Sequence, residues 1–166
     1  MEYLPHCTSA ELESVMERYG RMVYRLAYSH TRCRADAEDI YQEVFLRYFQ
    51  KRPVFDSEDH RRAWLLRVTV NRCRTLFASA WFRHRASLAG WDTAMEREET
   101  GLDEALALLR PGDRLVLHLF YYEELSVQEM AALLNRKDST IRTQLTRARR
   151  RLAAIMKGEG YAEEGL

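Results

Sequence analysis

Apolar side chains recur along most of this chain at steps of three and four residues, the spacing of one face of an α-helix. The first such stripe consists of Leu12, Val15, Met16, Tyr19, Met22, Val23, Leu26 and Ala27. Thr8 and Glu11 precede it with the spacing of a capping box, so the first helix is predicted to begin near Thr8. Only three prolines occur and β-branched runs are absent. We therefore predict an all-α protein.

The segment Asp36–Phe49, DAEDIYQEVFLRYF, predicts a second helix with two different faces. Its apolar stripe consists of Ile40, Val44 and Tyr48, widened by Phe45 and Phe49. A second face carries Asp36, Asp39 and Glu43 at steps of three and four, with Gln42 beside them. Three functions fit such a face: a metal site, a catalytic carboxylate pair, or a docking surface for a basic partner. A plain solvated face is the alternative.

A loop is predicted next, because Pro53 forces an extended conformation on Arg52. Asp56 or Ser57 can cap the helix that follows. That third helix is predicted over residues 58–77, with an apolar side formed by Trp64, Leu65, Val68 and Leu76. Residues 86–101 have weak periodicity and are interpreted as a flexible linker.

The second half of the chain predicts a helix-turn-helix. Ser126 can cap a short helix that ends at Leu134, and Asn135 can take the left-handed conformation there. Ser139 or Asp138 is predicted to cap a final helix, whose inward side chains are Ile141, Leu145 and Leu152. A helix, a short turn and a helix with a basic outer face form this motif. We predict two small helical domains, at 1–85 and 102–160, with a tail at 161–166.

Charge is distributed unevenly although the formal net charge is only +1. Residues 61–85 contain seven arginines and no acid, and residues 136–157 contain eight basic residues against one acid. The stretch between them, 92–104, contains six acids against one arginine. Two basic blocks separated by an acidic stretch are typical of a protein that binds a polyanion.

Both basic blocks have the composition of nucleic-acid contacts. The final helix combines arginines with short polar side chains, which suits phosphates and base edges in the major groove. The block at 61–85 interleaves arginines with aromatic residues, which suits stacking on single-stranded bases. A solvated basic helix and core aromatics are the structural alternatives. We favour the core for Trp64, whereas Trp81 and Phe82 fit either position.

Several classes of function are disfavoured. The three cysteines are widely spaced without a CxxC pair, which argues against a disulfide framework or a zinc site and favours a reducing cytoplasm. No histidine stands at ligand spacing near the acidic face, and no phosphate loop or nucleophile elbow is present. We expect no catalysis, metal, cofactor or small-molecule substrate. No signal peptide or membrane span is predicted.

Three segments, in order, resemble the sigma-70 superfamily, and within it the small two-domain extracytoplasmic-function (group 4) sigma factors. DAEDIYQEVFLRYF resembles the segment called region 2.2, and AWLLRVTVNRCR resembles region 2.3–2.4. LSVQEMAALL followed by STIRTQLTRARRRL resembles region 4.2. The resemblance implies a factor that binds core RNA polymerase and directs promoter-specific transcription initiation.

The resemblance also implies roles for individual residues. Contacts to the β′ clamp coiled coil of the polymerase would come from Asp36, Asp39, Gln42 and Glu43. Recognition and melting of the −10 element would involve Arg52, Phe55, Arg61, Arg62, Trp64, Arg67, Asn71 and Arg74. Readout of the −35 duplex would involve Lys137, Ser139, Thr140, Arg142, Thr143, Gln144, Arg147, Arg149 and Arg150. The second domain would also meet the β flap, and an anti-sigma factor is an expected partner.

The chain departs from the family pattern at several positions. Asn135 stands where glycine is usual, Lys137 where serine is common, and Gln144 where arginine often follows. Thr75 stands where the family often has aspartate, in the −10 segment. The alternative from another class is a helix-turn-helix regulator that binds duplex DNA without polymerase, although it has no need of the acidic face. A paralogue that only binds proteins is a third reading, which leaves the arginines at 147–151 without a purpose.

Overall fold

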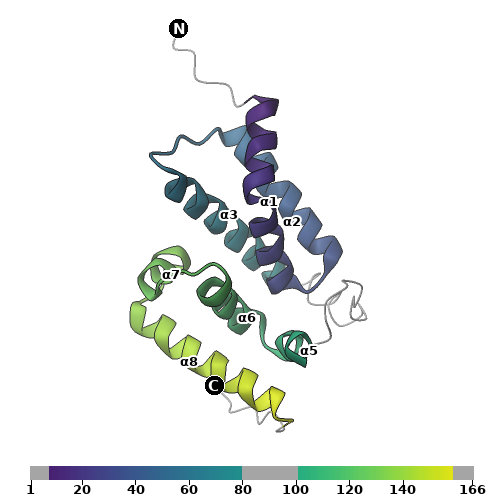
Figure 1. The fold of residues 1–166 in the computed structure, drawn as a ribbon, viewed down its shortest axis with the longest axis vertical. Coiled ribbons are helices and arrows are strands. Elements are labelled where there is room, and N and C mark those ends of the chain that lie inside the picture. Colours follow the sequence, from purple (N-terminus) through teal and green to yellow (C-terminus); the bar gives the residue numbers. More distant parts are fainter. Residues whose placement is uncertain (1–7, 80–100, 159–166) are drawn as a thin grey trace. The chain divides into compact units, whose positions relative to one another are not determined.

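The computed structural model describes residues 8–79 and 101–158. Every regular element in these ranges is a helix, which confirms the predicted all-α class. The chain forms two compact units, Met1–Trp91 and Asp92–Leu166, whose helices are shown in chain order in Figure 1. The predicted linker up to residue 100, the predicted tail, and Trp81 and Phe82 lie outside the described residues.

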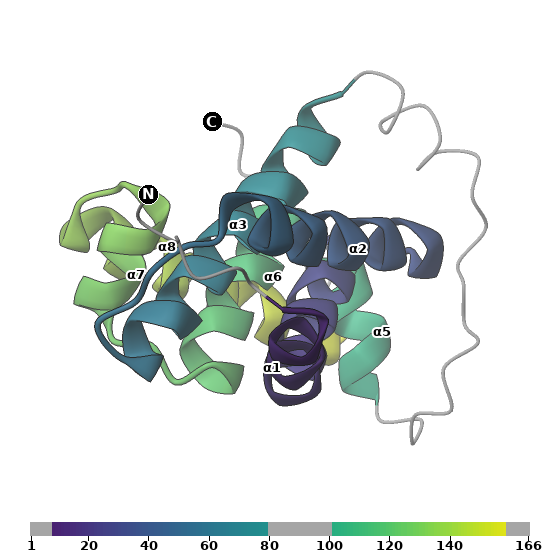
Figure 2. The ribbon, with the colours of Figure 1, turned by 90° about the horizontal axis from the view of Figure 1, so that it is seen from above.

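The first unit is built from three helices: α1 (Ser9–Thr31), α2 (Arg34–Lys51) and α3 (Glu58–Ala78). Each helix packs against the other two, as Figures 1 and 2 show for α1 against α2 and α3. The core between them contains Val15, Tyr19, Val23, Ala27, Ile40, Val44, Phe45, Tyr48, Leu65, Val68 and Cys73. Burying this apolar surface is the main source of stability for so small a unit.

Local sequence sets where these helices begin. The Thr8 hydroxyl accepts a hydrogen bond from the Glu11 amide at 3.2 Å, and the Glu11 carboxylate accepts one from the Thr8 amide at 3.0 Å. This is the predicted capping box. Ser57, one of the two predicted caps of the third helix, accepts a hydrogen bond from the His60 amide at 3.1 Å. Both caps satisfy amides that would otherwise have no partner inside the helix.

A glycine inside α1 allows close packing of α1 on α2. A Cβ atom added at Gly20 would stand 3.0 Å from the Tyr41 hydroxyl oxygen. Glycine in the middle of a helix costs roughly 0.5–1 kcal/mol relative to alanine. Glycine is used here despite that cost because any side chain at position 20 would crowd the Tyr41 side chain.

Glu58 connects the start of α3 to α1. Its carboxylate accepts a hydrogen bond from the Tyr19 hydroxyl at 2.5 Å and pairs with Arg61 at 2.8 Å and with Arg18 at 3.5 Å. The Tyr19 hydrogen bond, followed by the charges of Arg61 and Arg18, holds the pKa of Glu58 below its ordinary value. These contacts fix the position at which the loop before α3 meets α1.

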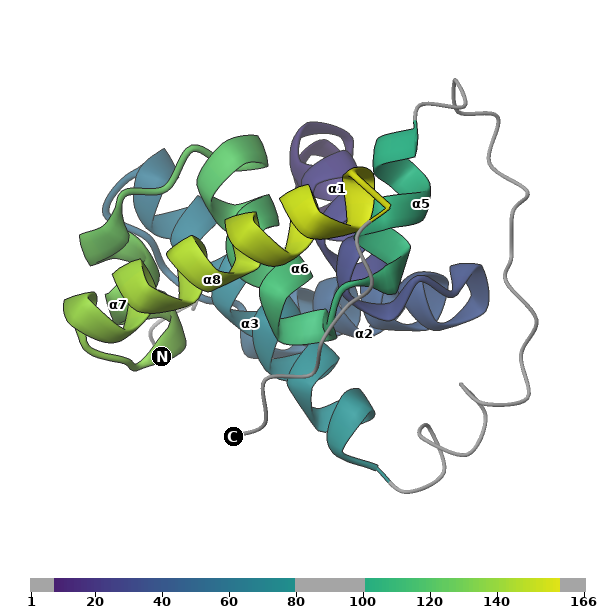
Figure 3. The same cartoon turned by 90° about the horizontal axis from the view of Figure 1, so that it is seen from below.

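The second unit contains α5 (Gly101–Leu108), α6 (Pro111–Leu117), η1 (His118–Tyr122), α7 (Val127–Leu134) and α8 (Asp138–Met156). The long helix α8 packs against α5, α6 and α7, as Figure 3 shows. The buried side chains of this unit include Leu109, Leu115, Val116, Leu119, Met130, Leu134, Ile141, Leu145 and Ala148.

Two buried charged residues join the helices of the second unit. The Arg114 guanidinium donates to the backbone oxygen of Leu109 at 2.5 Å and so satisfies a carbonyl just after α5. The Asp113 carboxylate is 4% exposed and accepts a hydrogen bond from Arg151 of α8 at 2.7 Å. An ion pair of this kind satisfies a buried charge, and removing one partner is strongly destabilising.

The segment η1 is a π-helix, which the sequence periodicity did not predict. The Glu123 amide donates to the His118 backbone oxygen at 3.2 Å, five residues earlier, in place of the usual four. The chain then turns at Glu124, whose φ is +55°. The additional residue per turn changes the direction in which Tyr121 and Tyr122 project, and both are exposed.

Three local expectations were wrong. Helix α8 begins after Lys137, which makes no side-chain cap, so neither Ser139 nor Asp138 is the cap. Asp138 instead lies in the first turn, where its charge favours the positive end of the helix dipole. Phe49 is 38% exposed rather than part of the core stripe of α2. Arg52, predicted to be extended before Pro53, instead adopts the left-handed conformation with φ +48°. Leu152 lies on the same side of α8 as Ile141 and Leu145 and is partly buried near the end of the helix.

Replacing Glu58 by glutamine should destabilise the first unit at neutral pH but not in acid. Because the folded-state pKa of Glu58 is lowered, its contribution is present above the ordinary glutamate pKa and is lost as pH falls through the lowered value. Urea unfolding followed by circular dichroism should separate wild type from Glu58→Gln at about pH 7 and bring them together in acid, below the lowered pKa of Glu58. Glu17→Gln, on the exposed side of α1, should match wild type throughout. An equal effect of Glu58→Gln at both pH values would contradict the assignment.

Candidate docking face and nucleic-acid interface

The outward side of α2 carries a polar stripe. Asp39, Gln42 and Glu43 are exposed. Gln42 and Glu43 follow Asp39 by three and four residues, so all three share one side of the helix. On the opposite side Ile40 and Val44 are buried, at 3% and 0% exposure. The structure therefore brings together three of the four residues that the sequence proposed for a docking face.

Asp36 does not share this face. Its side chain is 3% exposed, and it lies in the first turn of α2. A carboxylate there interacts favourably with the positive end of the helix dipole. Spacing placed Asp36 with Asp39, but the Asp36 side chain is buried, so we correct the predicted set to exclude it.

Glu43 already has a partner within the fold. Its carboxylate pairs with the guanidinium of Arg72 on α3, and both side chains are only partly exposed, at 47% and 32%. The Arg72 Nε atom is buried without a hydrogen-bond partner in the described residues. No described residue forms an ion pair with Asp39. The negative charge of Asp39 is therefore fully available on this face, whereas Arg72 partly neutralises the charge of Glu43.

Sequence reasoning missed an apolar component of the face. Leu46 is 55% exposed and lies one turn beyond Gln42 and Glu43, and Phe49 is 38% exposed one turn further. An exposed apolar side chain bordered by polar groups is typical of protein–protein contact sites. The step from Gln42 to Leu46, four residues, was the sequence signal that could have identified it.

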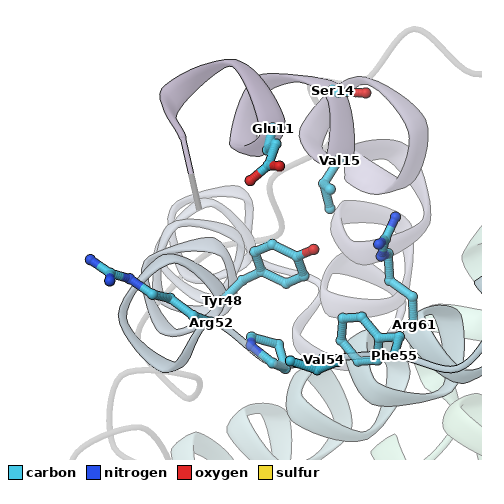
Figure 4. A pocket seen from close by; sticks show the side chains of 9 residues that line it. Glu11, Ser14, Val15, Tyr48, Arg52, Val54, Phe55 and Arg61 are labelled. Atoms are coloured by element: carbon cyan, nitrogen blue, oxygen red, sulfur yellow. The ribbon is translucent and has the colours of Figure 1, made fainter. Parts of the chain in front are cut away.

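A pocket of about 350 Å³ lies where α1, α2 and the loop before α3 meet. Its lining residues are Glu11, Ser14, Val15, Tyr48, Arg52, Pro53, Val54, Phe55 and Arg61. Figure 4 shows the rings of Tyr48 and Phe55 beside the pocket and the Arg52 side chain extending away from it. Arg52 adopts the left-handed conformation, φ +48°, that ends α2 and turns the chain into the loop. The pocket combines aromatic surface with charged residues at its rim.

Phe55 and Trp64 are held in an aromatic cluster. The Phe55 ring lies 6.1 Å from Tyr48, 6.1 Å from Trp64 and 5.2 Å from His60, measured between centroids. Trp64 also meets Tyr48 edge-on at 5.7 Å. This packing favours the core interpretation of Trp64. Val54, at 78% exposure, is the apolar side chain that the loop leaves in solvent.

The remaining candidates on α3 divide into an outward stripe and two partly exposed arginines on other sides of the helix. Arg67, Asn71 and Arg74 follow one another at steps of four and three, with Arg67 and Asn71 exposed and Arg74 partly so. Arg61 and Arg62 lie on other sides of the helix. The Arg61 guanidinium stands over the Phe55 ring at 5.3 Å as well as pairing with Glu58.

The helix-turn-helix is formed by α7 and α8. The Ser126 hydroxyl accepts a hydrogen bond from the Glu129 amide at 3.1 Å, and Asn135 ends α7 with φ +54°, both as predicted. The outward side of α8 consists of Ser139, Thr143, Thr146 and Arg150, at steps of four, three and four. Lys137, Thr140, Arg142 and Arg147 are exposed on either side of it. This arrangement suits a helix that enters the major groove.

Gln144 is held by hydrogen bonds within the second unit. Its side-chain oxygen accepts a hydrogen bond from Arg136 at 2.5 Å, and its amide donates to the Gly112 backbone oxygen at 3.4 Å. Gln144 thus connects α8 to the turn before it and to the first turn of α6. We infer a structural role for Gln144, and its contact with DNA stays a prediction.

The described residues contain no group of three or more His, Cys, Asp or Glu side chains that could hold a metal ion. The Cys73 thiol is buried in the core, and burial raises its pKa to about 12, so it is not a reactive thiolate. Within 8–79 and 101–158 no helix is both long and apolar enough to span a bilayer.

Comparison with known proteins identifies the family. Residues 15–83 match the family model for sigma-70 region 2, and residues 100–152 match the model for sigma-70 region 4. This chain belongs to the sigma-70 family. The resemblance to the sigma-70 superfamily, which rested on three short segments, is thereby confirmed, and extracytoplasmic-function (ECF) sigma factors are among the relatives of this chain. The two matched regions contain the α2 stripe and the helix-turn-helix respectively.

Among its relatives is the "Probable RNA polymerase sigma factor RfaY" of Xanthomonas campestris pv. campestris, 30% identical over 88% of this chain and 41% of that protein. The ECF RNA polymerase sigma factor BldN of Streptomyces coelicolor is 26% identical over 94% of this chain and 65% of that protein. This sigma-70 chain thus spans less than two thirds of either relative. The sigma factor RpoE of Bartonella quintana, solved with the anti-sigma factor NepR, has the same fold. Its TM-score is 0.70 at 20% identity, over 90% of this chain and 99% of that one.

Replacing Gln144 by alanine should weaken the fold of the second unit rather than change what α8 recognises. Loss of two hydrogen bonds that hold α8 in place should cost about 1–2 kcal/mol of unfolding free energy. Urea unfolding gives that cost, and sequence selection from randomised duplexes gives the recognised motif. A changed motif with unchanged stability would restore Gln144 as a base contact.

Proposed function

We propose that this chain is an alternative sigma factor, which binds core RNA polymerase and directs initiation at specific promoters. The observation that carries the proposal is the presence of two unlike surfaces in one chain. The α2 stripe of Asp39, Gln42, Glu43 and Leu46 suits a basic protein partner, and the outward side of α8 suits duplex DNA. A regulator that bound DNA alone would need only α8.

The α2 stripe would dock on the β′ clamp coiled coil. Asp39, which has no ion-pair partner among the described residues, would supply the charge, and Leu46 would supply apolar contact area. Glu43 would contribute less charge because Arg72 already contacts it. Interface energy is concentrated in a few well-buried contacts, so Asp39 and Leu46 are the expected centres of this face.

The first unit would also recognise and open the −10 element. The stripe of Arg67, Asn71 and Arg74 would follow one strand, and the pocket between α1 and the loop would receive an unstacked base. Val54, exposed beside the pocket, would contact that base or its neighbour. The region 1–85 would thus carry polymerase binding and −10 recognition.

The second unit, within 102–160, would read the −35 element with α8. Ser139, Thr143 and Arg150 would face base edges, whereas Lys137, Arg142 and Arg147 would contact phosphates or the edges of the site. The chain would perform no catalysis of its own and would act in the cytoplasm, where polymerase and promoters are found. An anti-sigma factor is a further proposed partner, as found for RpoE with NepR.

Reversing the charge of Asp39 should weaken polymerase binding without unfolding the protein. Asp39→Lys places a like charge against a basic partner, so we expect roughly a ten-fold or greater loss of affinity, about 1.4 kcal/mol. Co-elution with purified bacterial core RNA polymerase and a titration of affinity give the result. Glu17→Lys, on the exposed side of α1, is the matched control and should bind like wild type. If wild type itself fails to bind the polymerase, the stand-alone regulator becomes the better reading.

Replacing Arg142 by alanine should weaken promoter binding to a similar degree on every duplex, because its place on the flank of α8 puts it at a backbone phosphate. A loss of about 1–3 kcal/mol confined to one position of the upstream element would instead make Arg142 a base contact. Holoenzyme affinity for a set of single-base variants of a selected promoter measures both effects. Lys157→Ala removes the same charge just beyond the end of α8 and should leave affinity unchanged. Equal affinities of Arg142→Ala and wild type for every duplex would remove Arg142 from the interface.

A further inference from the structure

Arg149 is the most restrained arginine on the exposed side of α8. Its Nε atom donates a hydrogen bond to the Tyr121 hydroxyl oxygen at 2.7 Å. Its guanidinium carbon lies 5.2 Å from the Phe120 ring centroid and 5.5 Å from that of Tyr121. The two rings meet edge to face at 5.0 Å, so they form a corner in which the guanidinium rests. Within the described residues no carboxylate pairs with it.

These contacts leave part of the guanidinium available. The hydrogen bond uses Nε, and the two terminal nitrogens carry the remaining donors in a planar fork that matches a phosphate. A long arginine side chain normally loses rotamer freedom when it binds. Here the aromatic corner and the hydrogen bond have already restricted it, so a ligand would bind at a lower entropic cost.

The position of Arg149 favours a phosphate over a base. Arg149 follows Arg142 by seven residues, close to two full turns, so both lie on one flank of α8. The outward side between the flanks is formed by Ser139, Thr143, Thr146 and Arg150. When such a helix enters the major groove, its outward side reaches base edges and its flanks pass the two backbones.

The π-helix explains why Tyr121 stands beside α8. Its hydrogen bond from Glu123 to His118 adds a residue to the last turn before the helix-turn-helix. Tyr121 is 58% exposed, more than core packing would leave a tyrosine, yet its hydroxyl has a defined partner in Arg149. A bulge of this kind is often found at a functional position.

We propose that Tyr121 is a positioning residue that holds Arg149 ready to contact a backbone phosphate of duplex DNA next to the bases read by α8. The inference rests on the proposed function, since it presupposes that α8 binds a duplex. It assigns a role to η1, which sequence resemblance did not include among the DNA-binding residues.

The experiment compares holoenzymes assembled from core polymerase and full-length variants of this chain. The single variants are Tyr121→Phe, Arg149→Ala and Arg149→Lys. Two double variants combine Tyr121→Phe with each of the Arg149 substitutions. The probe is a set of duplexes that the wild-type holoenzyme selects from a pool with a randomised upstream element. Affinity is measured across a range of salt concentrations, and each variant also repeats the selection. Tyr122→Phe removes the neighbouring hydroxyl and is the matched control.

We expect Tyr121→Phe to weaken binding about three- to ten-fold on every duplex, with the selected motif unchanged, because Arg149 loses its restraint but keeps its charge. Arg149→Ala should weaken binding further and reduce the salt slope by about one. Tyr121→Phe should add nothing once Arg149 is alanine or lysine, since neither side chain has the Nε–H that Tyr121 holds. Tyr122→Phe should match wild type.

Additive losses in either double variant would show that Tyr121 acts independently of Arg149 and would overturn the inference. So would a changed motif in Arg149→Ala, which would make Arg149 a base contact, or wild-type affinity in Tyr121→Phe. These outcomes leave the proposed function intact because the wild-type holoenzyme has selected a motif. Failure of the wild type to bind polymerase or to select any motif would overturn the proposed function, and this inference with it.

Discussion

The burial of one apolar stripe on each helix orients the exposed side chains of this protein. On α2, Ile40 and Val44 are buried in the core, so the helical period places Asp39 and Glu43 on the solvent side. On α8, the burial of Ile141, Leu145 and Ala148 places a row of hydroxyls and an arginine outward in the same way. The docking face and the DNA face are thus two consequences of one packing requirement. A substitution that rotated either helix would displace its whole face together.

Contacts within each unit restrain several of the charged and polar side chains that a partner would meet. Glu43 is paired with Arg72, Gln144 bonds to Arg136, and Arg149 is held by Tyr121. Each contact is at least partly exposed, so each adds little to stability by itself. Their larger effect is geometric, because a restrained side chain presents its remaining donors in one direction. The surface that a partner meets is therefore smaller and better ordered than the sequence composition suggests.

Features set by neighbouring residues could be predicted from the sequence, and features set by distant ones could not. The Thr8–Glu11 box and the Ser126 cap each depend on residues three apart, so both were found. Gln144 bonds to Gly112, 32 residues away, and periodicity contains no information about that contact. Whether Asp36 is buried depends likewise on how its helix turn packs. The π-helix requires one residue more per turn, which a search for steps of three and four cannot detect.

The ion pair between Glu43 and Arg72 connects the two candidate surfaces of the first unit. Arg72 is next to Asn71 on α3, so its attachment to α2 helps fix the rotation that turns Arg67 and Asn71 outward. A basic partner that approached Glu43 would compete with Arg72. The competition has a cost, because within the described residues the buried Arg72 Nε atom already has no hydrogen-bond partner, and loss of Glu43 would also remove the ion pair of that guanidinium. Binding at the α2 stripe is therefore expected to centre on Asp39 and Leu46. Arg72 can then stay paired with Glu43 and keep α3 in place for its proposed contact with DNA.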